Sequence, residues 1–221
     1  MGKFGVNARD GTRAQLACEH APARSGRRLR AGRPPLRILA LCGSARRDSV
    51  NAKLLAVAVA ALRVAGPEVT VVDHKAWRLP LYRGDWEQAD GLPAAATQLA
   101  ELGASHHDLL IASPEYNGFI TPLPKNILDG MSRTETDPFA GKVAAVVSAL
   151  PGALGGIKSQ IFAKQFLSNL GCFVIPATCT LPRSRKAFAQ DGALKGARAA
   201  KSVEALVAQL DEATRKLTVT G

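Results

Sequence analysis

Short apolar runs alternate with longer segments of helical composition along most of this chain. Apolar runs of this length, bounded by glycine, proline or polar residues, are typical of buried strands. The sequence predicts such strands at 38–42, 69–73, 108–113, 142–150 and 172–175. It predicts helices at 52–65, 92–103, 121–133, 157–170 and 193–217, and a loop between residues 77 and 91.

The alternation of strand and helix favours an α/β fold: an open, mostly parallel sheet with helices on both faces. The runs at 38–42, 108–113 and 142–150 are apolar along nearly their whole length, as expected when both faces of a strand are covered. In such a sheet, ligands bind beyond the carboxyl ends of the strands, where the strand order reverses. Polar or glycine-rich loops follow these same three strands, so we expect their chemistry to meet at one edge of the sheet.

The helix predicted at 157–170 is amphipathic. Its apolar stripe is formed by Ile157, Ile161, Phe162, Phe166 and Leu170. Lys158 and Lys164 lie off that face.

The first loop, residues 43–51, has the composition of a phosphate site. It carries two serine hydroxyls, an asparagine amide and the guanidiniums of Arg46 and Arg47, and it leads directly into a helix. A helix N-terminus presents free N–H groups and the positive end of its dipole. Strand, polar loop and helix together therefore predict a phosphate cradle.

The second loop, residues 113–118, reads Ser-Pro-Glu-Tyr-Asn-Gly. Pro114 stiffens the turn, and Asn117 and Gly118 tolerate a positive φ. Such a turn could border a flat heterocycle with exposed N–H groups and one aromatic ring. A purely structural turn fits these residues equally well.

The third loop, residues 148–156, is rich in glycine, which permits close approach of a ligand to the backbone. It is not a P-loop, because Ile157 separates Gly156 from Lys158 and Ser159. The first strand–helix turn also lacks the Gly-x-Gly-x-x-Gly fingerprint of dinucleotide-binding folds. The sequence therefore excludes these two common ways of holding a nucleotide.

Charge is unevenly distributed along the chain. The net charge is +11, of which residues 1–35, with eight basic and two acidic side chains, contribute +6. We expect residues 1–35 to be a disordered basic extension and residues 36–221 to form one domain. A nucleic-acid-binding arm is the alternative, but the remaining +5 of the domain argues against nucleic acid as a partner.

No feature of the sequence indicates a membrane protein, a secreted protein or a metal site. No apolar run approaches the roughly 18 residues of a membrane helix, and residues 1–35 lack the apolar core of a signal peptide. The four cysteines form no Cys-x-x-Cys pair, and His106 and His107 have no ligand partners at suitable spacing. We expect a cytoplasmic protein with reduced thiols and no bound metal.

Three motifs together resemble those of one enzyme family. Residues 43–51 match the Gly-Ser-x-Arg-x-x-Ser-x-Asn loop of the NADPH-dependent FMN reductase family. Its second motif resembles Pro-Glu-Tyr-Asn-Gly at 114–118, followed by Lys125, Asn126 and Asp129. Its third region is similar to Gly155-Gly156 with Gln160 and, later, Leu170-Gly171. The resemblance spans about residues 36 to 190.

The resemblance implies a flavodoxin-like three-layer sandwich with a five-stranded parallel sheet of order 2-1-3-4-5. It also implies tightly bound FMN, NADPH or NADH as electron donor, and a homodimer or homotetramer. Electrons would pass by a ping-pong cycle to a quinone-like, azo or chromate acceptor. The alternative is a flavin-binding electron carrier without efficient nicotinamide turnover.

The resemblance also assigns residues. The FMN phosphate would be held by Ser44, Arg46, Ser49, Val50 and Asn51. The isoalloxazine would be lined by Pro114, Glu115, Tyr116, Asn117 and Gly118. Ser148 would touch the third side of the flavin. No catalytic acid or base and no metal ligand is expected, because the flavin carries the chemistry.

Some positions depart from the family pattern. Pro124 stands where a leucine usually precedes the Lys-Asn pair, Gly130 replaces a bulky aromatic residue, and Lys158 stands where arginine is common. The segment 82–86, Tyr-Arg-Gly-Asp-Trp, is also unusual, and we expect it to shape the substrate entrance.

Overall fold

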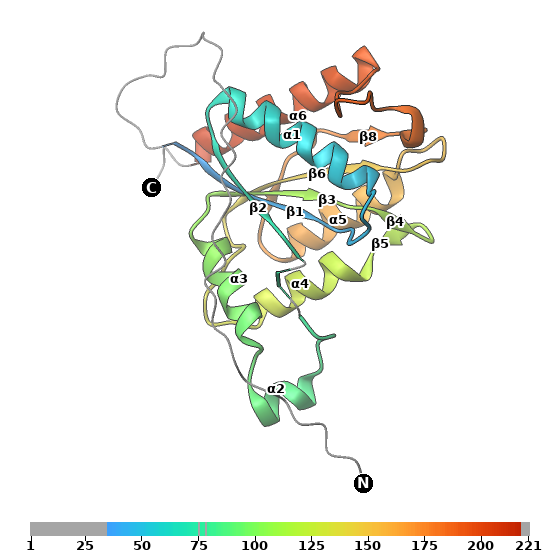
Figure 1. The fold of residues 1–221 in the computed structure, drawn as a ribbon. Helices are drawn as coiled ribbons and strands as arrows, with labels where there is room; N and C mark the ends of the chain where they lie inside the picture. The colour runs from blue at the N-terminus through green and yellow to red at the C-terminus, as the bar shows by residue number, and fades with distance from the viewer. Residues whose placement is uncertain (1–34, 75, 78, 218–221) are drawn as a thin grey trace. The chain divides into compact units, whose positions relative to one another are not determined.

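The structure, a computed structural model, describes residues 35–74, 76–77 and 79–217. Its main sheet consists of β1 (Arg37–Cys42), β2 (Glu68–Val72), β3 (Asp108–Ala112), β6 (Val143–Ala149), β7 (Phe173–Val174) and β8 (Cys179–Leu181). A hairpin is formed by β4 (Glu115–Tyr116) and β5 (Phe119–Ile120). The helices are α1 (Val50–Ala65), α2 (Gly84–Asp90), α3 (Ala94–Ala104), α4 (Pro122–Ser132), α5 (Ile157–Asn169) and α6 (Ala197–Leu217), with a short 3-10 helix at Ser184–Lys186. Figure 1 shows this arrangement.

The sheet is parallel and has the order β2-β1-β3-β6-β7, which confirms the predicted strand order. The position beside β6 is shared, because β7 pairs with the start of β6 and β8 pairs with its end. Pro176 stands between the two strands and lacks the N–H that a continuous strand would need. The prediction of a single strand at 172–175 therefore missed β8.

Helices cover both faces of the sheet. Alternate residues of β1 point to opposite sides: Ile38 and Ala40 pack with α1 and α6, whereas Leu39 and Leu41 pack with α3, α4 and α5. Figure 1 shows the same two layers of helices. All residues of β3 and β6 are buried, as the continuous apolar runs predicted.

The buried face of α5 differs from its apolar stripe. Ile161 and Phe162 are 58% and 43% exposed, whereas Ser159 and Gln160 are buried. Both polar side chains point inward because they bond to backbone carbonyls: Gln160 Nε2 donates to Val146 of β6 at 2.6 Å, and Ser159 Oγ donates to Pro114 of the second loop at 2.7 Å. The apolar stripe is therefore divided: Phe166 and Leu170 pack against the core, whereas Ile161 and Phe162 are exposed.

Three further features were not predicted: α2, inside the expected loop 77–91, the β4–β5 hairpin, and the 3-10 helix at Ser184–Lys186. The expected extension 1–35 lies outside the described residues except for residue 35. Among the residues that the structure describes, none of the helices has the length and apolar character needed to cross a membrane.

Candidate functional site

The three loops that follow β1, β3 and β6 begin at the same level of the sheet. Cys42 pairs with Ala112, and Ala112 pairs with Val147. The backbone continues this register one residue further, because the Gly43 N–H donates to the carbonyl of Ala112 at 2.8 Å and the Ser113 N–H to that of Val147 at 2.9 Å. Parallel strands in this register bring the loops 43–51, 113–118 and 148–156 to one edge.

The first loop presents donors to an anion. Ser49 caps α1, its Oγ accepting the Ala52 N–H at 3.2 Å, and Ser44 Oγ accepts the Arg46 N–H at 3.4 Å. The first turn of α1 contains no acidic residue, and the side chains of Arg46 and Arg47 are exposed. The helix itself provides no partner for the first N–H groups of this turn. A phosphate group fits this donor set.

Asn51 links the first loop to the third. Its Nδ2 donates to the carbonyl of Ala149 at 2.9 Å, and its Oδ1 accepts the N–H of the same residue at 2.9 Å. The side chain is only 4% exposed. The side chain of Asn51 therefore bridges the first and third loops. The neighbouring Val50, half-buried at the start of α1, can contribute only its backbone N–H to a ligand.

The second loop is a tight hairpin. Asn117 and Gly118 have φ values of 51° and 78°, and they connect β4 to β5 as a two-residue turn of the kind that Asn-Gly favours. Tyr116 is 56% exposed, so its ring is available to a ligand at the open side. Glu115 turns the other way, and its Oε2 accepts the backbone N–H of Ser159 in α5 at 3.3 Å.

The missing side chain at Gly43 makes room for two proline rings, those of Pro114 and Pro124. A Cβ at residue 43 would lie 2.8 Å from Cγ of Pro124 and 2.9 Å from Cδ of Pro114. Thr121 Oγ1, at the start of α4, also donates to the Gly43 carbonyl at 2.7 Å. Pro124, the departure from the family pattern, therefore packs the first loop against α4, and Pro114 packs it against the second loop.

The glycines of the third loop permit close packing within the protein. A Cβ at Gly155 would lie 2.6 Å from the backbone N of Pro182, and one at Gly156 would lie 1.9 Å from Ser148 Oγ. Both residues have positive φ, at 61° and 90°. Ser148 is fully buried, and its Oγ donates to the carbonyl of Ser113 at 2.7 Å. Its hydroxyl thus contacts the second loop from the protein interior.

Ser159 was missed by sequence reasoning. It is fully buried in the first turn of α5, and its Oγ lies 2.6 Å from Ser113 Oγ. Its sequence neighbours Lys158 and Gln160 are polar, so no local pattern marked it as buried.

Thiol chemistry has no support at this edge. Burial raises the pKa of the Cys42 thiol, and it raises the pKa of Cys172 to about 12 and that of Cys179 to about 11. These three cysteines are free and buried. In the described ranges, the histidine, cysteine and acidic side chains form no group that could hold a metal ion.

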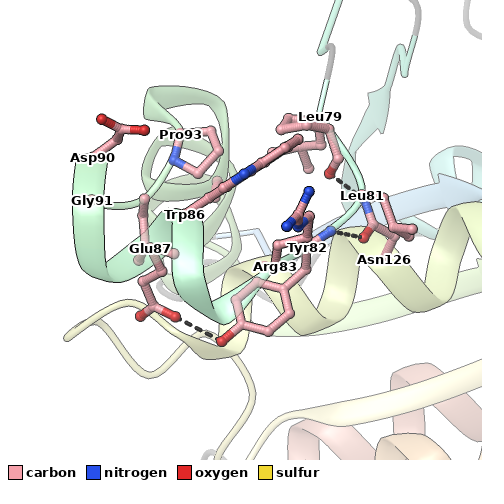
Figure 2. Close-up of a pocket in the computed structure, with 14 residues that line it drawn as sticks. Leu79, Leu81, Tyr82, Arg83, Trp86, Glu87, Asp90, Gly91, Pro93 and Asn126 are labelled. Carbon is pink, nitrogen blue, oxygen red and sulfur yellow. Dashed lines mark hydrogen bonds between the residues drawn. The ribbon is translucent and has the colours of Figure 1, made fainter.

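A separate pocket of about 230 Å³ lies among α2, α3 and α4, shown in Figure 2. Arg83 stacks over the ring of Trp86 at 4.3 Å, and the Tyr82 hydroxyl donates to Glu87 at 2.7 Å. Gly130 lines this pocket, and a Cβ there would meet only the Cβ of Ala96, at 3.6 Å. A bulky side chain at residue 130 would enter this pocket, and glycine leaves it open.

None of the residues of the three loops lines that pocket. Asn126 fixes the segment before α2, since its Oδ1 accepts the Tyr82 N–H at 2.8 Å and its Nδ2 donates to the Pro80 carbonyl at 2.9 Å. The suggestion that residues 82–86 shape a substrate entrance stays a prediction.

Comparison with known proteins finds relatives of this chain. The sequence profile described as NADPH-dependent FMN reductase matches residues 36–186. A quinone reductase of Escherichia coli K12 is 32% identical over 140 residues, which cover 63% of this chain and 73% of that protein. A probable NADPH:quinone oxidoreductase of Oryza sativa is 38% identical over 136 residues, covering 61% and 68%.

Two solved structures show the same fold. FerB of Paracoccus denitrificans, described as a flavoenzyme NAD(P)H:(acceptor) oxidoreductase, superposes with a TM-score of 0.71 at 26% identity over 82% of this chain and 98% of that one. An archaeal flavodoxin superposes with a TM-score of 0.53 at 8% identity over 81% and 99%, which supports the fold alone.

Proposed function

This chain belongs to the NADPH-dependent FMN reductase family, and from that premise we propose that it passes electrons from NADPH or NADH to a small quinone-like acceptor. Azo compounds and chromate are further acceptors in this proposal, and donor and acceptor react in turn by a ping-pong cycle. The names of the relatives support the quinone class most directly. The relevant cofactor is FMN, in keeping with the family.

One observation carries the proposal: the loops after β1, β3 and β6 leave the sheet in register at one edge. A phosphorylated flavin has a charged end and a flat ring, and this edge offers a donor-rich helix terminus beside a hairpin with an exposed aromatic residue. These are the two kinds of surface that such a ligand needs.

In this proposal the FMN phosphate is bound by Ser44, Arg46, Ser49, Val50 and Asn51. The ring is bordered by Pro114, Glu115, Tyr116, Asn117 and Gly118. Arg46 supplies charge, while Val50 supplies a backbone N–H of the first turn. Asn51 contributes mainly through the loop contact to Ala149 described above. Ser148 acts from behind, through its bond to the Ser113 carbonyl.

Bound FMN would supply hydride and electron transfer, so the protein needs no acid or base of its own. The tasks left to the chain are to bind the phosphate, to orient the ring and to exclude water from one of its faces. Prolines 114 and 124 packed on Gly43 stiffen the loops for this purpose. We also propose that residues 36–221 carry the activity and that the protein works in the reducing cytoplasm.

A homodimer or homotetramer is part of the proposal. Ile161, Phe162 and Phe119 form an exposed apolar surface, with the rings of Phe119 and Phe162 4.5 Å apart. Contiguous apolar surface of this kind marks protein–protein contact. A second copy of the chain is the partner that the family implies.

The test is direct. The purified chain should be yellow and release FMN, rather than FAD, on denaturation. It should also oxidise NADPH or NADH steadily when a quinone is supplied. FMN without steady nicotinamide oxidation would favour the electron-carrier alternative, and a colourless chain that takes up no FMN would contradict the proposal.

A further inference from the structure

Three fully buried serines meet beneath the second loop. Ser113 directly follows β3, Ser148 lies near the end of β6, and Ser159 lies in the first turn of α5. Buried hydroxyl groups are costly unless they are hydrogen-bonded, so their partners define what they do.

The shortest distances favour one assignment of the three hydroxyl donors, although Ser159 Oγ also lies 3.2 Å from the Ser113 carbonyl oxygen and Ser113 Oγ 3.5 Å from that of Pro114. Ser159 Oγ lies 2.7 Å from the Pro114 carbonyl and 2.6 Å from Ser113 Oγ. A hydroxyl has one proton to donate. If Ser159 donates to the Pro114 carbonyl, Ser113 must donate to Ser159, and Ser148 donates to the Ser113 carbonyl at 2.7 Å. Each of the three protons is then used, and the carbonyls of Ser113 and Pro114 are held against the interior.

Ser159 also holds the next residue of the loop. Its backbone N–H donates to Glu115 Oε2 at 3.3 Å, at the N-terminus of α5, where a carboxylate is favoured by the helix dipole. A single residue of α5 thus contacts Ser113, Pro114 and Glu115. We call this set of contacts the Ser159 clamp.

The clamp determines which backbone groups face outward. In a trans peptide, the carbonyl and the following N–H point in opposite directions. Since the Pro114 carbonyl points to Ser159, the Glu115 N–H points away from it. In a two-residue hairpin the pair next to the turn, Tyr116 and Phe119, is the hydrogen-bonded one, so the next pair leaves the Glu115 N–H unused by β5.

We propose that Ser159 is a positioning residue, which fixes the second loop so that its N–H groups are held toward the flavin ring. This inference rests on the proposed function, because it assumes that the ring lies against this loop. Donors held in place stabilise the electron-rich reduced ring more than the oxidised ring. The clamp should therefore affect both the affinity for FMN and its midpoint potential.

The experiment compares Ser159→Ala and Ser159→Cys with Ser168→Ala, a matched control on the exposed side of the same helix. A thiol is larger than a hydroxyl and is a weak donor, so the cysteine variant fills the space without restoring the bonds. Three quantities are measured: amide hydrogen exchange of residues 115–118 in flavin-free protein, the FMN dissociation constant, and the midpoint potential of bound FMN.

We expect both Ser159 variants to speed exchange at residues 115–118, to weaken FMN binding by roughly tenfold, and to lower the midpoint potential, with the control unchanged. Wild-type values in Ser159→Ala, or full rescue by Ser159→Cys, would overturn the clamp. A wild-type chain that takes up no FMN would contradict the proposed function instead, and the exchange rates would then decide on the clamp alone.

Discussion

Arg46 is exposed in the first loop, four residues before the start of α1, and its neighbour Arg47 carries the same charge. Arg46 matches the arginine of the family motif at residues 43–51, whereas Arg47 stands at a position that the motif leaves unspecified. A charge-assisted hydrogen bond contributes about 1.5–3 kcal/mol, so Arg46→Ala should raise the FMN dissociation constant by roughly 10- to 100-fold. Flavin fluorescence titration measures this change, and Arg47→Ala is the control. Equal effects of both variants would mean that only general charge matters.

Asp108 is a buried carboxyl at the start of β3, and burial raises its pKa to about 7. Its Oδ2 accepts the Thr214 hydroxyl at 2.6 Å. Because the folded-state pKa lies above the unfolded value, this group favours folding below about pH 4, and that contribution is lost as the pH rises to about 7.

Asp108→Asn should therefore stabilise the protein at pH 8, by up to about 4 kcal/mol, with a gain that disappears toward pH 4. Urea denaturation at the two pH values measures the difference. A gain that is the same at both values would show that the carboxyl does not titrate on folding.

At the residue scale, sequence reasoning found the residue types of the loops but not their partners. Asn51 bonds to a residue 98 positions away, and Ser148 bonds to one 35 positions away. Such pairings depend on strand register, which local patterns do not contain. The positive φ of Asn117 was predictable because it follows from a local turn.

Among the elements, the turn into α5 depends most on glycine. At Gly156 an alanine would combine a φ of 90° with a Cβ 1.9 Å from Ser148 Oγ. Gly156→Ala should lower the free energy of unfolding by about 2 kcal/mol or more. Gly141→Ala is the matched control, since its φ is 74° but nothing lies within 4 Å of its Cβ. Equal losses in chemical denaturation would exclude the contact with Ser148.

Elements with a clear apolar period were predicted well, and those with competing demands were not. The strands β1, β3 and β6 were found because both of their faces are buried. The inward position of Ser159 and Gln160 in α5 was not, because these side chains bond to backbone carbonyls of the second loop and of β6. The helix α2 has no buried residue, so no apolar period marked it.

For the molecule as a whole, the exposed face of α5 tests the proposed assembly. Phe162→Glu places a charge on the surface formed with Ile161 and Phe119, so it should convert an oligomer to monomers. Light scattering measures the molar mass. Val64→Glu, at a residue of α1 that is 90% exposed, is the control and should leave the mass unchanged. An unchanged mass in Phe162→Glu would exclude this surface as the interface.

The reciprocal pair between Asn51 and Ala149 has a consequence for the timing of cofactor capture. The pair connects the first and third loops before any ligand binds. The conformational entropy of these loops is therefore lost on folding and not on binding. The first and third loops should consequently be as rigid before FMN binds as after it. FMN should then bind in a single fast association step to a preorganised site, with no slow conformational change after it.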